Sequence, residues 1–164
     1  MSPSSPSMVG RGRTPFLHLP VPWVFVLAYL LGEGLQLLLP VRPPTGALAP
    51  ATLVGGGVLF VAGAVVAGWG LLTFRRAATT TVPGEKPARL VTEGPYQWTR
   101  NPMYVGLLVA YLGEAGLLAQ VWPLLPLLLV LAYVQWFVIP VEEASLAAFG
   151  ADYQEYRARV RRWI

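Results

Sequence analysis

The sequence predicts an all-α integral membrane protein: a helical bundle of four transmembrane helices, followed by a C-terminal amphipathic helix at the membrane interface. Of its 164 residues, 55% are hydrophobic and only 12% are charged, and the mean hydropathy is +0.55. Such a composition is too apolar for a soluble domain of this length. Four apolar runs approach or exceed the ~20 residues that a helix needs to cross the hydrocarbon core.

A disordered cytoplasmic tail is expected over residues 1–15, which are rich in Ser, Pro and Gly, and a single membrane domain over residues 16–164. The first apolar run lacks an Ala-x-Ala-like cleavage site and carries Glu33 and Gln36. It is therefore interpreted as a retained span and not as a signal peptide. The predicted spans cover approximately residues 16–39, 51–74, 102–119 and 123–141.

Glycine recurs through the second predicted span. Small residues in a membrane helix let a neighbouring backbone approach closely, so this helix is expected to pack against other helices and not to face lipid on all sides. The glycines concerned are Gly55, Gly56, Gly57, Gly63, Gly68 and Gly70.

Residues 142–163 are predicted to form the amphipathic helix, because apolar side chains recur there at spacings of three and four. A helix of this kind is expected to lie along the headgroups with its arginines toward anionic lipid. The apolar face consists of Tyr153, Tyr156, Val160 and Trp163. The basic residues around it are Arg157, Arg159, Arg161 and Arg162.

The basic residues are distributed unevenly between the two sides of the predicted bundle. Of the 12 Lys and Arg residues, Arg42 alone falls on the opposite side. By the positive-inside rule, both termini and the 75–100 loop are expected to be cytoplasmic. The net charge of +4 thus follows from topology, and no nucleic-acid partner is expected.

The chain contains no cysteine and a single histidine, His18. A thiolate site, a histidine-based metal centre and a Ser-His-Asp triad are therefore not expected. His18 lies near the cytoplasmic start of the first span and is interpreted as an interfacial residue.

A polar and aromatic cluster, residues 94–106, leads directly into the third span. Asn101 before Pro102 predicts a helix start, with Asn as N-cap and Pro at the first helical position. A helix N-terminus favours a bound carboxylate or phosphate. Arg100 adds a cation that can bind such a group in a bidentate manner.

The short turn at 119–123 predicts that the third and fourth spans run antiparallel, so that Glu142 and Glu143 return to the depth of Arg100. The aromatic residues Tyr96, Trp98 and Tyr104 offer ring faces for a cation. Together these groups predict a pocket for a zwitterionic, cationic ligand. The residues alone leave open the alternative that Arg100 and Glu142 merely pair as interfacial anchors.

Glu33 and Glu114 fall within predicted spans, nearer the outer face than the candidate site. A charge inside a span is costly and often marks function. We interpret both as protonated, or as reaching the outer headgroups. The alternative is that they line a substrate cavity.

The second half of the chain carries three motifs in order. They are Leu90-Val91-Thr92-x-Gly94-x-Tyr96, then Arg100-Asn101-Pro102-x-Tyr104-x-Gly106, then Glu142-Glu143-x-x-Leu146 with Phe149-Gly150, Tyr153, Tyr156 and Val160. This combination resembles the isoprenylcysteine carboxyl methyltransferase family and its bacterial relatives, which include phospholipid methyltransferases. The resemblance covers about residues 86–161, and the first two spans match only as generic helices.

The resemblance implies an enzyme of a bacterial inner membrane that transfers a methyl group from S-adenosylmethionine to a lipophilic or lipid substrate at the cytoplasmic face. Its cofactor would lie at the cytoplasmic end of the last helix pair, with Arg100 and Glu142 as catalytic residues. Arg100 is placed nearest the chemistry or the cofactor carboxylate. The implied cofactor-binding residues are Ala88, Arg89, Leu90, Val91, Gly94, Tyr96, Arg100, Asn101, Pro102, Met103, Tyr104, Glu142 and Glu143.

We expect direct in-line displacement at the sulfonium methyl, which depends mainly on positioning in a desolvated pocket. The apolar substrate would reach the site laterally from membrane lipid. The family often has His where this chain has Asn101, which donates a hydrogen bond but cannot titrate. Val138 stands in the place of a substrate-binding arginine of eukaryotic members, which argues against a prenylcysteine carboxylate acceptor.

Two other classes of function remain as alternatives. A membrane NADPH-dependent reductase of the sterol-reductase type would share this architecture, but no dinucleotide glycine fingerprint follows a strand here. A non-catalytic membrane assembly protein is the other. A small transporter is disfavoured, because the chain has no internal repeat and only two acidic residues inside the spans.

Overall fold

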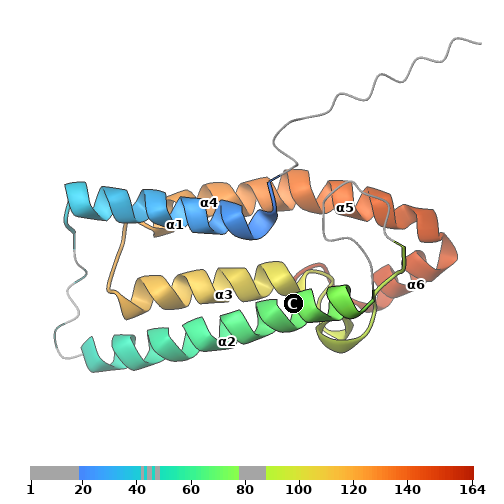
Figure 1. Ribbon diagram of the computed structural model, residues 1–164, viewed down its shortest axis with the longest axis horizontal. Coiled ribbons are helices and arrows are strands. Elements are labelled where there is room, and N and C mark those ends of the chain that lie inside the picture. Colours follow the sequence, from blue (N-terminus) through green and yellow to red (C-terminus); the bar gives the residue numbers. More distant parts are fainter. Residues whose placement is uncertain (1–18, 42, 44–45, 47–48, 78–87) are drawn as a thin grey trace, which may run out of the picture.

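The computed structural model describes residues 19–41, 43, 46, 49–77 and 88–164. Within these residues every regular element is helical, which confirms the all-α prediction (Figure 1). The α-helices are α1 (Val21–Leu38), α2 (Ala49–Arg76), α3 (Pro102–Leu117), α4 (Leu124–Tyr133), α5 (Ile139–Leu146) and α6 (Ala151–Arg159). A π-helical turn, Val134–Val138, continues α4 into α5, and 3₁₀ turns occupy Gly94–Gln97 and Ala147–Phe149. The predicted tail over residues 1–15 and His18 lie outside the described residues.

Three helical segments of the described chain are long and apolar enough to cross a membrane: Val21–Leu38, Ala49–Arg76 and Leu124–Phe149. The helix expected as a further span, α3, has 16 residues. At ~1.5 Å per residue it is roughly 24 Å long, short of the ~30 Å hydrocarbon core. A fourth complete crossing therefore remains a prediction, although α3 lies alongside α2 (Figure 1).

The contact between α2 and α3 depends on glycines that recur every seven residues. A Cβ atom on Gly63 would collide with the backbone of Ala110, and one on Gly106 would collide with the backbone of Ala67. The predicted close packing is thus confirmed at Gly63, and equally at Gly56 and Gly70. It is not observed at Gly55 or Gly68, where an added Cβ would meet nothing within 4 Å.

The second helix pair, α1 and α4, packs over α3 through aromatic rings. Tyr111 of α3 makes edge contacts with Tyr29 and Phe25 of α1, with ring centroids 5.0 and 6.4 Å apart. Val134 and Val138 of the π turn are fully buried and extend the same core. The two helix pairs are therefore joined along their length by one apolar layer.

At the end formed by the 118–123 turn, polar side chains tie α1 to the α3–α4 connection. Tyr29 donates to Gln120 Oε1 at 2.8 Å, and the Gln120 amide donates to Glu33. Trp122 Nε1 donates to the carbonyl of Leu39 at 2.6 Å. Glu33 thus accepts a hydrogen bond from Gln120, and its protonation or its reach to the outer headgroups remains a prediction.

A cavity of about 340 Å³ also lies at this end, between α2, α3 and the turn. We refer to it as the far cavity. Its lining residues include Thr52, Leu112, Gly116, Gln120 and Leu124.

The C-terminal helix is shorter than predicted and is interrupted. Gly150 separates the 3₁₀ turn after α5 from α6, and its φ of +58° is a conformation that favours glycine. The chain leaves the helix after Arg159 and is extended at Val160, with φ −114° and ψ 128°. The continuous helix predicted over residues 142–163 is therefore wrong.

Protein covers the apolar face of α6. Tyr153 and Tyr156 are buried in a small cluster of their own. The partly buried residues packed against that cluster are Leu90, Leu146 and Phe149. An interfacial position for α6 remains a prediction, but these tyrosines do not insert into lipid.

Candidate functional site

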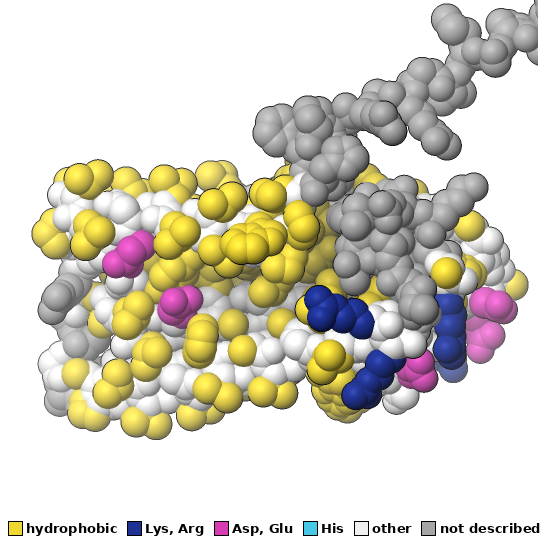
Figure 2. All heavy atoms as spheres, in the orientation of Figure 1, with side chains coloured by type: hydrophobic (Ala, Val, Ile, Leu, Met, Phe, Trp, Pro, Cys, Tyr) yellow, Lys and Arg dark blue, Asp and Glu magenta, His cyan; other side chains and the backbone are white. Residues whose placement is uncertain are grey.

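The arginines of the described chain gather at one end of the bundle, where residues 88–101, α5, α6 and the last residues of the chain meet (Figure 2). All the candidate site residues lie at or near this end. We refer to residues 160–164, which follow α6, as the C-terminal segment. It packs back onto the start of α3, because the backbone N–H of Arg100 donates to the carbonyl of Arg161 at 2.9 Å.

Arg100 is the best-connected residue of the site. Its Nη1 donates to Oε1 of Glu143 at 2.8 Å and to Oη of Tyr153 at 3.3 Å. The side chains of Arg100 and Glu143 are only 12% and 17% exposed. The predicted return of the chain to the depth of Arg100 is confirmed by this contact.

Glu143 also binds a second guanidinium. Arg162 donates from Nε to Oε1 at 3.1 Å and from Nη2 to Oε2 at 2.6 Å. One carboxylate is therefore shared by two arginines, and the cluster carries one excess positive charge. An anionic group is the ligand that such a cluster favours.

The Nε atom of Arg100 supports the expectation that the cluster binds an anionic group. It is buried and has no hydrogen-bond partner among the described residues. Buried donors are almost always paired, so an orphaned one suits a ligand acceptor. The carboxylate of an amino-acid moiety, such as the one in S-adenosylmethionine, fits this donor in charge and in chemistry.

Glu142 occupies a separate polar position one residue away. Its Oε1 accepts a hydrogen bond from the hydroxyl of Tyr104 at 2.6 Å, and Tyr104 itself is buried. The ion pair of Arg100 is made with Glu143, so the alternative in which Arg100 and Glu142 anchor each other is wrong. Glu142 instead presents a half-buried carboxylate whose orientation is set by a phenol.

Asn101 precedes α3 as predicted, and Pro102 occupies the first turn, but the amide does not cap the helix. Its Nδ2 donates instead to the carbonyl of Arg162 at 2.8 Å. The predicted side-chain cap is therefore wrong: the amide is held by the C-terminal segment, and its oxygen accepts from no backbone N–H at the start of α3. The first-turn amides of α3 are left without an acceptor from Asn101, which suits an anion.

Tyr96 forms an inner wall of this end of the bundle. It is buried, and its ring meets Phe74 at a centroid distance of 5.0 Å. Tyr156 donates to its carbonyl at 2.8 Å. Burial, and secondarily the charge of Glu142, raises the pKa of Tyr96 far above its usual value. This phenol therefore stays neutral and acts as a surface for packing.

Several predicted residues do not join the polar cluster. Arg89 is exposed and faces Glu93, with 3.8 Å between their charged atoms. Trp98 is 68% exposed, and its ring makes an edge contact with Trp69. Met103 and Leu90 pack in apolar surroundings. Their roles as cofactor-binding residues, with those of Ala88, Val91 and Gly94, remain predictions.

The sequence reasoning missed three polar residues of this cluster: Arg162, Tyr153 and Thr99. Arg162 and Tyr153 had been assigned to the two faces of a membrane-surface helix. Thr99 donates from Oγ1 to the carbonyl of Arg162 at 3.1 Å, across 63 residues of sequence. No local pattern indicates such contacts, because they depend on the way in which α6 and the C-terminal segment pack against the start of α3.

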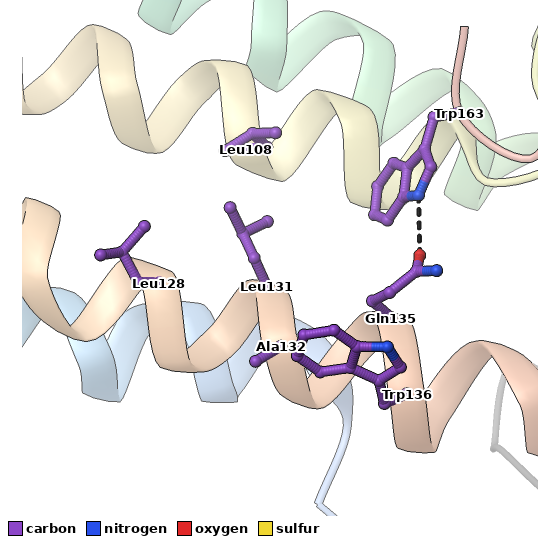
Figure 3. A pocket seen from close by; sticks show the side chains of 7 residues that line it. All are labelled: Leu108, Leu128, Leu131, Ala132, Gln135, Trp136 and Trp163. Carbon is purple, nitrogen blue, oxygen red and sulfur yellow. Dashed lines mark hydrogen bonds between the residues drawn. The ribbon is translucent and has the colours of Figure 1, made fainter.

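An apolar cavity of about 400 Å³ lies beside the cluster, between α3 and the α4–π-turn segment (Figure 3). We refer to it as the lateral cavity. Trp163, next in sequence to Arg162, closes it by donating from Nε1 to Oε1 of Gln135 at 2.9 Å. The lining residues are Leu108, Leu128, Leu131, Ala132, Gln135, Trp136 and Trp163.

The π turn that carries Gln135 and Trp136 has a local cause. Pro140 lacks an amide hydrogen, so it cannot donate to the carbonyl of Trp136 and the helix widens just before it. The amide of Ile139 reaches the carbonyl of Val134, five residues back. Such turns are frequent at functional sites.

Comparison with known proteins gives one match. A family model described as phospholipid methyltransferase matches residues 51–150. The matched region runs from α2 to Gly150, so it includes Arg100, Tyr104, Glu142 and Glu143 and ends before α6. No curated protein and no solved structure matches the chain.

Proposed function

Since the chain belongs to the phospholipid methyltransferase family, we propose that it transfers a methyl group from S-adenosylmethionine to a lipophilic acceptor at the membrane surface. The observation that carries this proposal is that consecutive residues contribute to a cationic polar cluster and to an apolar cavity. Arg162 belongs to the cluster and Trp163 to the lateral cavity. One site thus offers binding for a charged, water-soluble donor beside binding for a hydrocarbon acceptor.

The residues present fit the methyl donor. Arg100 offers a buried, unpaired Nε to a carboxylate, and the uncapped start of α3 adds backbone N–H groups nearby. Glu142 offers a carboxylate to a hydroxyl group or to a positive charge. When bound, the cofactor supplies an electrophilic methyl group on a positively charged sulfur.

The residues of the chain contribute mainly by positioning. Tyr104 fixes the carboxylate of Glu142, and Glu143 fixes the guanidinium of Arg100. Asn101 cannot titrate, and Tyr96 is held neutral by burial. Catalysis by orientation and exclusion of water is therefore the role that this site supports.

The same arrangement supports a membrane location for the acceptor. The lateral cavity is almost wholly apolar and lies between helices whose outer faces carry exposed leucines. A hydrocarbon chain is the ligand class that such a lining favours. The arginine-rich end would face the cytoplasm, in a bacterial inner membrane, by the positive-inside rule.

The test is incubation of the purified protein, in vesicles of total membrane lipid, with S-adenosylmethionine labelled with tritium in its methyl group. We expect label in the lipid-extractable fraction. A parallel incubation with tritiated NADPH examines the reductase alternative, which the family match does not favour. Label from NADPH and none from S-adenosylmethionine would overturn the proposal.

A further inference from the structure

We propose that Trp163 is the specificity-determining residue of the acceptor site, and that it sets the bulk of the single hydrocarbon chain that the lateral cavity admits. This inference rests on the proposed function for the identity of the acceptor. It extends that function to the C-terminal segment, which lies outside the region that the family model matches.

The backbone of the C-terminal segment is held rigidly against the start of α3. The carbonyl of Arg161 accepts from the Arg100 amide at 2.9 Å. The carbonyl of Arg162 accepts from Thr99 Oγ1 at 3.1 Å and from Asn101 Nδ2 at 2.8 Å. These three hydrogen bonds fix the segment on both sides of Arg162, so the position of Trp163 is defined.

The C-terminal segment directs neighbouring side chains to different neighbours. Arg162 reaches Glu143 in the polar cluster, whereas Trp163 reaches Gln135 and lines the lateral cavity. Two consecutive residues therefore connect the cation cluster with the apolar cavity.

The bridge between Trp163 and Gln135 closes one end of the cavity. Figure 3 shows Leu128 and Leu131 leading along the α4 side to this bridge, which joins the π turn to the C-terminal segment. Gln135 precedes Glu142 and Glu143 on the same helical segment, so the bridge is at the end of the cavity nearer these two residues. A hydrocarbon chain in the cavity would therefore lie against the indole, whose neighbour in sequence, Arg162, belongs to the polar cluster.

The volume of the lateral cavity limits its occupant to one hydrocarbon chain. About 400 Å³ is near the lower end of the ~300–1,000 Å³ range of small-molecule sites, which suits a single chain of a membrane amphiphile. The indole has a rigid apolar body and a single polar N–H, which the Gln135 amide satisfies. Smaller side chains at position 163 should therefore admit bulkier, branched chains.

A binding experiment that needs no methyl transfer tests the site. The protein is placed in phosphatidylcholine vesicles containing a phospholipid with a diazirine in one acyl chain, irradiated and mapped by mass spectrometry. We expect a straight-chain probe to form adducts at Leu131, Gln135 and Trp163, and to keep those at Leu131 and Gln135 in Trp163→Ala. A methyl-branched probe should label Leu131 and Gln135 only in Trp163→Ala. Adducts confined to the far cavity or to exposed leucines would overturn the inference.

The matched variants separate specificity from folding. Trp163→Phe keeps a ring but loses the N–H donor, and Ile164→Ala changes the adjacent residue, which is 81% exposed. We expect the ratio of kcat/KM for straight-chain over methyl-branched acceptors to fall about tenfold in Trp163→Ala, as changes in an apolar pocket typically cause. Trp163→Phe should restore most of that ratio. Equal ratios in Trp163→Ala and Ile164→Ala would contradict the inference.

The two proposals fail in different ways. If the wild-type protein transfers no label but Trp163→Ala alone admits the branched probe to the cavity, the proposed reaction is wrong and the hydrocarbon site stands. If label is transferred but the wild type and Trp163→Ala bind the branched probe equally, the reaction stands and this inference is wrong.

Discussion

Nη1 of Arg100 lies 2.8 Å from Oε1 of Glu143, although 43 residues separate them in sequence. The pair connects the start of α3 with α5, and Arg162 joins it from the C-terminal segment. It therefore holds the arginine-rich end of the bundle together while it leaves Arg100 Nε free for a ligand.

Replacing Glu143 with Ala should destabilise the protein strongly. Removing the shared carboxylate leaves two guanidinium groups largely buried and unpaired, and breaking such a pair costs about 3 kcal/mol or more. Glu155→Ala is the matched control, because its pair with Arg159 is exposed and 3.9 Å long, and such pairs contribute roughly 0–1 kcal/mol. The free energy of unfolding in detergent measures both, and similar losses would refute the structural role of Glu143.

Arg100→Ala and Glu142→Ala should each abolish binding of S-adenosylmethionine measured by titration calorimetry. Arg100→Ala removes the donor assigned to the carboxylate, and Glu142→Ala removes the acceptor fixed by Tyr104. Arg159→Ala, which removes an exposed arginine outside the site, tests whether charge alone matters. Undiminished affinity in both site variants, with the fold retained, would count against the site.

Tyr104→Phe should weaken methyl transfer by about tenfold or more. The change removes only the hydroxyl that orients the Glu142 carboxylate, and a hydrogen bond to a charged group contributes about 1.5–3 kcal/mol. Tyr111→Phe also loses a buried hydrogen bond, to the carbonyl of Pro123 at 2.7 Å, but at the other end of the bundle. It should lower stability and leave donor affinity unchanged. A similar loss of transfer in both variants would show that Tyr104 acts only through stability.

Two glycines of α2 should respond to alanine with opposite signs. Gly63→Ala places a Cβ against the backbone of Ala110, and overpacking of this kind costs about 1–3 kcal/mol. Gly68→Ala meets nothing within 4 Å and should stabilise the helix by roughly 0.5–1 kcal/mol. The midpoints of thermal unfolding of the two variants test this prediction. Equal shifts of the two midpoints would contradict the packing between α2 and α3.

Apolar run lengths and turn residues were sufficient to predict the helices and the antiparallel return that brings Glu143 to Arg100. They were not sufficient for the C-terminal end. The spacing of Tyr153 and Tyr156 fits a lipid-facing stripe as well as a protein-facing one, and Leu90, which packs against them, lies about sixty residues earlier in the chain. Periodicity reports that a face is buried and does not report what buries it.

The roles of single polar side chains were harder to predict than the fold. Asn101 before Pro102 has the local signature of a cap, yet its amide bonds to Arg162, 61 residues away. The side chain is therefore held by a distant part of the chain that no local pattern indicates. The π turn, by contrast, had a visible signal in Pro140 within an otherwise continuous apolar helix.

The hydrogen bonds from Tyr29 to Gln120 and from Trp122 to Leu39 fasten α1 to the connection between α3 and α4 at one end of the bundle. At the opposite end, Arg100, Glu143 and Arg162 bind one another, and a single hydrogen bond, from the Trp163 indole to the Gln135 amide in the π turn, bridges the end of the lateral cavity. Exchange of one lipid for another therefore requires only this hydrogen bond to open, while the helices stay in place.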